Sequence, residues 1–109
     1  MNHSLPALDD HGLEAALEFG TKPLVVDFWA PWCGPCRTAM PTFAQIAGEM
    51  ADQAEFATVN VDENPALAGR YDVRSIPTVL VFSRGALVGR SIGAQSADQL
   101  RQLVGAGLR

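Results

Sequence analysis

One stretch of the 109-residue chain decides its fold: Pro23-Leu24-Val25-Val26-Asp27-Phe28-Trp29-Ala30-Pro31-Trp32-Cys33-Gly34-Pro35-Cys36. Its first half is apolar at odd and even positions alike, so residues 24–30 predict a central strand that is buried on both faces. A helix follows from about residue 33 or 34 to about residue 50. Pro41 lies well inside that helix and predicts a kink, because its ring clashes with the carbonyl four residues earlier. Two cysteines therefore stand where a buried strand gives way to a helix.

A shorter helix is expected before this stretch, over about residues 11–19. Asp9 or Asp10 can cap its N-terminus, and Gly20 ends it. Its apolar stripe consists of Leu13, Ala16 and Leu17. This helix can cover one face of a sheet.

The remaining elements follow the long helix. A strand over 55–62 alternates in polarity, and a helix over about 65–71 follows it, with Asn64 as cap and Pro65 at its first position. Strands over 78–82 and 87–92 are joined by a turn at 83–85. Ser96 caps a last helix, whose apolar side consists of Leu100, Leu103, Val104 and Leu108. The early alternation of helices and strands predicts parallel strands with right-handed crossovers, and the closing hairpin makes the sheet mixed. We therefore expect one α/β domain over residues 1–109, with a mixed sheet flanked by helices on both faces, and a monomer.

Composition and charge exclude several classes of protein. Hydrophobic residues make up 48% of the chain, which is ordinary for a globular domain. The net charge is −4 and the basic residues are scattered, so a nucleic-acid partner or a polybasic membrane patch is not expected. The longest apolar run is too short to span a bilayer. The first ten residues lack the pattern of a secretory signal, which favours a cytoplasmic location.

The pair Cys33 and Cys36 is the sharpest chemical signal in the sequence. Residues three apart on a helix have Cβ atoms about 5–6 Å from each other, and a small adjustment brings them within disulfide range. Unpaired N–H groups at the helix N-terminus favour a thiolate at Cys33, which makes Cys33 the expected attacking residue. Cys36 is the expected resolving residue, because thiol–disulfide exchange needs a second thiol to release the mixed disulfide.

Half of a zinc site is the alternative interpretation of two cysteines at this spacing. Zinc would need two further ligands, and the only histidines are His3 and His11, both near the N-terminus. Each histidine is better explained as a surface residue. We therefore expect no metal and no bound cofactor, only a redox-active disulfide between the two cysteines.

The chain resembles the thioredoxin family along nearly its whole length. The resemblance lies in Phe28 to Arg37 with Pro41 after it, in Val59-Asn60-Val61-Asp62-Glu63-Asn64-Pro65, in Ile76-Pro77-Thr78 and in Gly85. It implies the thioredoxin fold and a general protein disulfide reductase, with thioredoxin reductase and disulfide-containing proteins as partners. Gly34 and Pro35 are typical of the reducing members, whereas oxidases and isomerases of this fold usually carry a histidine there. A non-catalytic docking subunit of the same fold is a further alternative.

The same resemblance implies a substrate-binding surface around the cysteines. Pro77 alone would be read as an ordinary strand-opening proline, but family members have a cis bond here, between Ile76 and Pro77. Ser75 and Ile76 would pair with an extended substrate chain through backbone hydrogen bonds. The flat apolar patch expected by analogy consists of Trp32, Gly34, Pro35, Ile76, Pro77, Ile92, Gly93 and Ala94. Trp29 is expected to pack beneath this surface, and strand core is the alternative for Ile92.

Asp27 is a carboxylate within an otherwise apolar strand, where a charge is costly unless it has a partner. It is either a hydrogen-bonded structural residue or a proton acceptor for Cys36 whose pKa is raised by burial. Its position six residues before Cys33 matches the buried aspartate of thioredoxins, which favours the second interpretation. Many thioredoxins place a lysine close to this aspartate, but this chain has Thr58, so the cation that would moderate the Asp27 pKa is absent.

Overall fold

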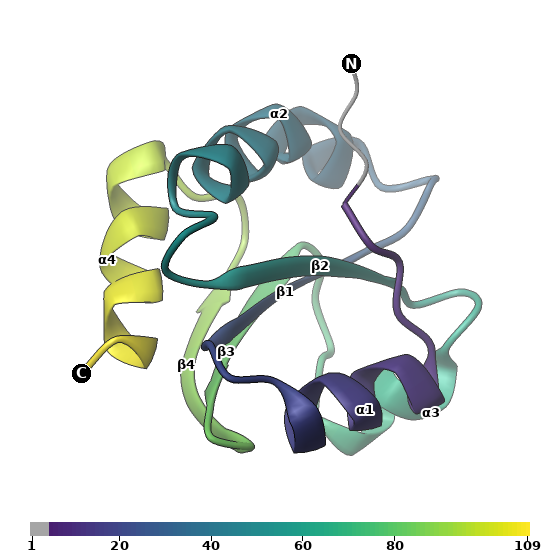
Figure 1. Ribbon diagram of the computed structural model, residues 1–109. Coiled ribbons are helices and arrows are strands. Elements are labelled where there is room, and N and C mark those ends of the chain that lie inside the picture. Colours follow the sequence, from purple (N-terminus) through teal and green to yellow (C-terminus); the bar gives the residue numbers. More distant parts are fainter. Residues whose placement is uncertain (1–4) are drawn as a thin grey trace.

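Four strands and four helices occupy residues 5–109, the part of the chain that the computed structural model describes. In chain order they are α1 (Asp10–Phe19), β1 (Leu24–Trp29), α2 (Gly34–Glu49), β2 (Glu55–Asn60), α3 (Pro65–Arg70), β3 (Thr78–Ser83), β4 (Ala86–Ile92) and α4 (Ala97–Gly107). Every expected helix and strand is present. Most of their ends lie within two residues of the predicted position. Figure 1 shows the eight elements and their connections.

The strands form one mixed sheet in the order β2-β1-β3-β4. β1 and β2 are parallel, as expected, but β3 runs antiparallel to β1, so the prediction of parallel strands was wrong for β3. The connection from β2 to β3 holds one short helix, α3, and the register of β3 on β1, with Thr78 opposite Phe28 and Phe82 opposite Leu24, starts β3 at the end of the sheet where β2 ends. The chain therefore returns from the end of the sheet at which it left.

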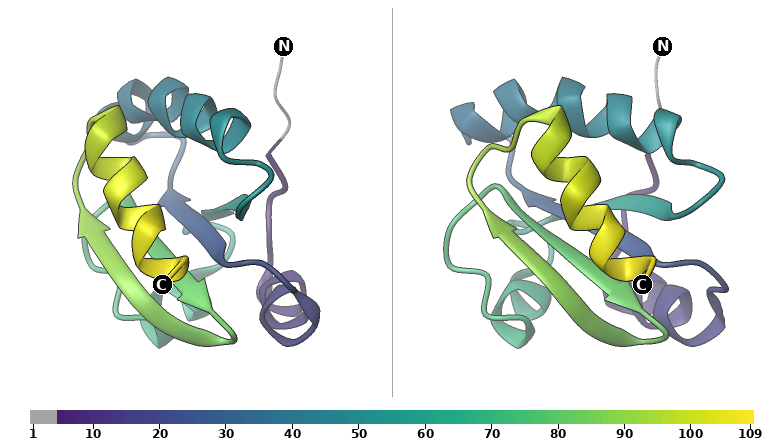
Figure 2. Two further views of the ribbon diagram at one scale, coloured as in Figure 1. Left: turned by 60° about the vertical axis from the view of Figure 1, so that its left-hand side comes forward. Right: turned by 90° about the vertical axis from the view of Figure 1, so that its left-hand side faces the viewer.

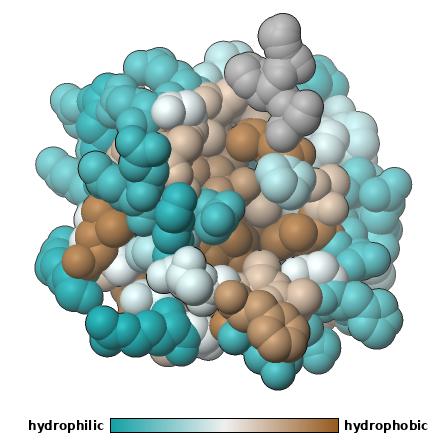
Figure 3. Space-filling view, in the orientation of Figure 1, coloured by the Kyte–Doolittle hydropathy of each residue, from teal (hydrophilic) through white to brown (hydrophobic). Residues whose placement is uncertain are grey.

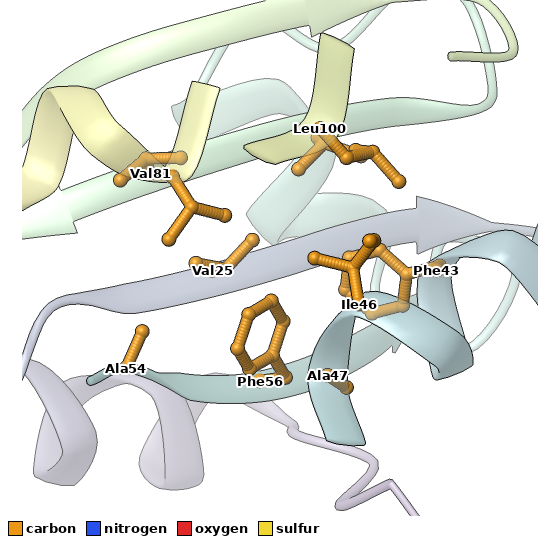
Figure 4. Close-up of a cluster of buried hydrophobic side chains, with 10 residues drawn as sticks. Val25, Phe43, Ile46, Ala47, Ala54, Phe56, Val81 and Leu100 are labelled. Atoms are coloured by element: carbon orange, nitrogen blue, oxygen red, sulfur yellow. The ribbon is translucent and has the colours of Figure 1, made fainter. Parts of the chain in front are cut away.

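Helices cover both faces of this sheet, as the views in Figures 1 and 2 show. On one face α2 and α4 pack over a cluster that includes Val25, Phe43, Ile46 and Leu100, drawn in Figure 4. On the other face α1 and α3 contribute Leu13 and Leu67, both 0% exposed, to a second apolar cluster. The alternation of side chains along a strand explains this division, because odd residues of β1 point to α2 and even residues point to α1.

β2 differs from the alternating strand that its sequence predicts. Residues 56–59 are all buried, so both faces of β2 are covered. Its outer edge is also paired, because Thr58 donates its N–H to the Pro6 carbonyl at 2.8 Å and accepts from the Leu8 N–H at 2.8 Å. Thr58 is buried although it is polar, so the alternation of polar and apolar residues along β2 does not correspond to an exposed and a buried face.

The helix caps follow the sequence with one exception. The Asp9 side chain accepts from the Gly12 N–H of α1, and Ser96 and Gln99 form a reciprocal capping box on α4. Asn64 holds the cap position of α3 but makes no side-chain capping hydrogen bond; its amide donates to the Asn60 carbonyl instead. At the far end of α4, Leu108 is 45% exposed, so it is not part of the buried side that was expected.

Two local predictions concern prolines and turns. α2 continues through Pro41 from Gly34 to Glu49, and the kink at this proline stays a prediction. The β3–β4 connection is a tight two-residue turn in which Arg84 and Gly85 have φ of 53° and 81°. Both angles lie in the left-handed region that hairpin turns of this type require, which explains the glycine.

Candidate active site

Cys33 and Cys36 form a disulfide at the N-terminus of α2, with 5.2 Å between their Cα atoms. Cys33 is the N-cap residue, and its Sγ accepts a hydrogen bond from the Cys36 N–H at 3.1 Å. Cys33 retains 4% exposure, whereas Cys36 is completely buried under the first turn. Gly34 and Pro35, at the first positions of the helix, are exposed. The pair therefore presents one sulfur toward the surface and keeps the other inside.

The antiparallel return of β3 brings three loops to the end of the sheet where this disulfide lies. The Ile76 carbonyl oxygen is 3.8 Å from Cys33 Sγ, and the Ile76–Pro77 peptide bond is cis, which confirms that prediction. The Pro77 carbonyl accepts from the Gly93 N–H at 2.8 Å. The end of β4 thus lies beside the loop that enters β3, and both lie beside the cysteines.

The expected surface residues differ in how far they reach solvent. Trp32 is 68% exposed and Ile92 is 62% exposed, so the alternative that Ile92 is strand core was wrong. Pro77 is buried and Ile76 is half-buried beneath them. Ser75 and Ala94 are exposed and Gly93 is half-buried. Trp29 packs against the cysteine cluster from below, as expected.

Two further residues hold the loop around the cysteines, and sequence reasoning assigned them no role. The Trp32 indole N–H lies 2.9 and 3.1 Å from the two carboxylate oxygens of Asp62, which fixes this exposed ring over the end of β2. The Arg37 guanidinium donates to the Pro31 carbonyl at 2.7 Å. The available sequence signal was the position of Asp62 two residues after β2, at the end of the sheet where the cysteines follow β1.

Asp27 lies on the α2/α4 face of β1 and is 2% exposed. Its Oδ1 has no hydrogen-bond partner, which argues against a satisfied structural carboxylate. Burial raises its pKa from 3.8 to about 7, because desolvation disfavours the charged form. A carboxyl with this pKa can hold or release a proton near neutral pH.

Thr58 stands directly opposite Asp27 in the parallel register of β1 and β2 and is buried on the same face. Its side chain borders a cavity of about 860 Å³ whose lining is mainly apolar and includes Trp29, Cys36 and Met40. In the orientation of Figure 3, apolar side chains gather near the centre of the molecule and hydrophilic ones surround them. Among residues 5–109, the cavity therefore leaves room for a longer side chain at position 58, although Asp27 is not part of its lining.

The alternative of a zinc site gains no support from the geometry. Within residues 5–109, no three side chains of His, Cys, Asp or Glu lie close enough together to hold a metal ion. His11 is exposed on α1, and His3 lies outside the described residues. In the same range, no helix is long and apolar enough to cross a membrane.

The amino-acid sequence is similar to those of known proteins over most of its length. The family model for thioredoxin matches residues 5–106. The chain is 41% identical over 100 residues to the thioredoxin of Acidithiobacillus ferridurans, covering 92% of this chain and 93% of that protein. It is 43% identical over 93 residues to the thioredoxin of Alicyclobacillus acidocaldarius, which is 85% of this chain and 88% of the relative. It is also 50% identical to Thioredoxin 1 of Synechococcus elongatus over 72 residues, covering 66% and 67% of the two chains.

Proposed function

This chain belongs to the thioredoxin family and is a thiol–disulfide oxidoreductase of the protein-disulfide reductase type, and we propose that its two sulfurs divide the reaction between them. Cys33 would attack the substrate, and Cys36 would release the product. The position of Cys33 carries this assignment: it is the N-cap of α2, and its Sγ accepts the Cys36 N–H, a contact that would stabilise a thiolate there.

The reaction starts from the reduced dithiol. The Cys33 thiolate attacks one sulfur of the substrate disulfide, the substrate S–S bond breaks, and one substrate thiolate leaves and is protonated. Cys36 then loses its proton and attacks Cys33 Sγ, which forms the Cys33–Cys36 disulfide and expels the second substrate thiolate. Two electrons pass from the protein to the substrate. A thioredoxin reductase would return them.

We assign the proton of Cys36 to Asp27. The unpaired Oδ1 and the pKa of about 7 support a carboxyl that accepts this proton as Cys36 attacks and returns it when the disulfide is reduced again. Thr58 leaves no cation beside Asp27, so burial alone sets the balance between its two forms. Gly34 and Pro35 would contribute by keeping the disulfide reducing rather than oxidising.

The substrate would lie across the exposed apolar surface around Cys33. An extended substrate segment could pair with the backbone of Ser75 and Ile76, as in strand addition, and this mode depends little on substrate sequence. The side chains around it would be Trp32, Pro77, Ile92, Gly93 and Ala94. Such a surface fits many disulfide-containing proteins rather than one.

We further propose that residues 1–109 act as one monomeric domain in the cytoplasm, as a soluble electron carrier between a reductase and its substrate proteins. Reduction of insulin disulfides in the presence and absence of thioredoxin reductase would test this role. A docking subunit without catalysis would give no acceleration in either case, and an oxidase would have a markedly higher reduction potential.

Mass spectrometry of single-cysteine variants tests the division of roles. We expect Cys36→Ser to accumulate a mixed disulfide on Cys33 when it meets a disulfide substrate, since attack proceeds and release does not. Cys33→Ser should be inactive and free of adducts. Adducts on Cys36 in Cys33→Ser, with none on Cys33 in Cys36→Ser, would reverse the assignment.

A further inference from the structure

An arginine on the outermost strand contacts the loop that borders the disulfide. Arg90 of β4 pairs with Leu80 of β3, so its side chain lies on the α1/α3 face of the sheet. Its Nη2 donates to the Tyr71 carbonyl at 2.6 Å, and its Nη1 lies 3.4 Å from the Asp72 carbonyl. One guanidinium thus joins β4 to the chain directly after α3.

The two carbonyls belong to a turn that needs such a contact. Tyr71 is the C-cap residue of α3, where helix carbonyls lack partners within the helix. Asp72 follows with φ of 56°, an uncommon conformation for a residue other than glycine. A cation at a helix C-terminus is favourable, and the planar fork of arginine can reach two adjacent carbonyls.

This turn lies only four residues before Ile76, whose carbonyl oxygen is 3.8 Å from Cys33 Sγ. Arg90 itself lies two residues before Ile92, at the end of β4. Arg90 therefore links the strand that leads to Ile92–Ala94 with the segment that leads to Ser75–Pro77, and the Gly93 N–H to Pro77 carbonyl hydrogen bond joins the two halves of the surface directly. The hydrogen bonds of Arg90 end at Tyr71 and Asp72, just before Ser75, and its own strand continues to Ile92.

We propose that Arg90 is a positioning residue for protein substrates, because its contacts with Tyr71 and Asp72 add to the direct Gly93–Pro77 hydrogen bond in fixing the spacing between Ser75–Pro77 and Ile92–Ala94. This inference rests on the proposed substrate-binding surface. A protein disulfide must dock on both halves of that surface before Cys33 can attack. A small disulfide needs only access to Cys33 and does not sense the spacing.

The test compares two substrates with four proteins: wild type, Arg90→Ala, Arg90→Lys and the control Arg84→Asn. Within residues 5–109 no hydrogen bond or ion pair of Arg84 is found, and asparagine tolerates the positive φ of that turn position. Stopped-flow measurements give the second-order rate constant of each reduced protein with insulin and with 5,5′-dithiobis(2-nitrobenzoate). The reduction potential and the urea midpoint are recorded for each protein.

We expect Arg90→Ala to slow insulin reduction about five- to tenfold through misplacement of the docking surface, with the small disulfide affected less than about twofold. Arg90→Lys should restore part of the insulin rate, because one ammonium can reach one carbonyl but not both. Arg84→Asn should match wild type, and no variant should change the reduction potential.

Equal losses with both substrates, or an unchanged insulin rate in Arg90→Ala, would overturn the proposal and leave Arg90 a stabiliser of α3. If Arg90→Ala does not fold, Arg90→Lys decides, since the proposal requires it to lose insulin activity selectively. A wild-type protein that reduced neither substrate would contradict the proposed function instead.

Discussion

The two faces of the sheet are both closed by a pair of helices, but they differ in how they treat buried polar groups. The α1/α3 face holds a cluster of aliphatic and aromatic side chains, and the buried Thr78 at the end of the sheet donates to the Ser75 carbonyl at 2.5 Å. The α2/α4 face also buries Asp27, with one carboxylate oxygen unpaired, and Cys36. A buried polar group without a partner costs stability. The second face therefore carries a destabilising buried carboxyl that the first face lacks.

The largest effect is expected on the α1/α3 face. Leu67→Ala removes a fully buried side chain and should lower the free energy of unfolding by about 2–5 kcal/mol, by lost burial and the cavity left behind. Urea unfolding measures this change. The rate of insulin reduction per folded molecule should stay unchanged, because Leu67 lies on the face without the cysteines.

Leu87→Ala is the matched control, since Leu87 is 41% exposed on β4. It should change the unfolding free energy by no more than about 0.5 kcal/mol. A loss of activity in Leu67→Ala at full folding would show that the two faces are not independent.

Asp27→Asn should have the opposite sign. The folded pKa of about 7 lies above the value of 3.8, so the folded state binds the proton more tightly and loses stability as pH rises from about 4 to about 7. Above pH 7 the loss is constant. At 1.36 kcal/mol per pKa unit, removing the charge should stabilise the protein at pH 8 by roughly 2–4 kcal/mol, with the upper value reduced because the amide is itself unpaired.

Urea unfolding of Asp27→Asn and wild type between pH 4 and 9 checks this expectation. The stabilisation should shrink as pH falls toward 4, because the folded carboxyl is protonated there and the unfolded carboxyl, with its pKa of 3.8, begins to take up the proton as well. The variant should also form the Cys33–Cys36 disulfide more slowly above pH 7. A variant less stable than wild type at every pH would make Asp27 a satisfied structural residue.

Thr58→Lys should give the buried Asp27 carboxyl a cationic partner and so lower its pKa. The new side chain would start opposite Asp27 in the sheet register, and the cavity of about 860 Å³ that Thr58 lines leaves room for its length. An opposite charge within about 4–6 Å lowers a carboxyl pKa by about 1–3 units. Titration of the Asp27 side-chain carbon by NMR measures this shift.

Thr58→Val is the control, because it keeps the shape of threonine without a charge. It should leave the Asp27 pKa raised. A lysine variant with the same raised pKa would mean that its ammonium turns to solvent instead of toward the carboxyl.

The smallest effects are expected from the helix caps, one on each face. Asp9→Ala on α1 and Ser96→Ala on α4 each remove a side-chain acceptor for a helix N–H and should cost about 1 kcal/mol. Thermal unfolding of both variants gives the comparison. Similar losses with normal insulin reduction would confirm that the faces differ in their buried polar groups and not in their helix ends.

Local patterns were sufficient for the elements and the cysteine pair, but not for contacts between distant segments. Periodicity reports burial and says nothing of strand direction, so it could not predict that β3 runs antiparallel to β1. The paired edge of β2 depends on residues 6–8, which show no strand pattern of their own. The contact of Trp32 with Asp62 spans 30 positions and only the folded sheet brings them together. The cis Ile76–Pro77 bond was predictable only through the family resemblance.

The hydrogen bond from the Cys36 N–H to Cys33 Sγ makes the first turn of α2 sensitive to the redox state. A thiolate is a stronger acceptor than a sulfur in a disulfide, because hydrogen bonds to a charged acceptor are the stronger kind. Reduction to the thiolate should therefore slow exchange of the Cys36 amide hydrogen with solvent, while amides in the middle of α2 keep their rates. The backbone at the start of this helix thus carries a label-free record of whether the protein holds its two electrons.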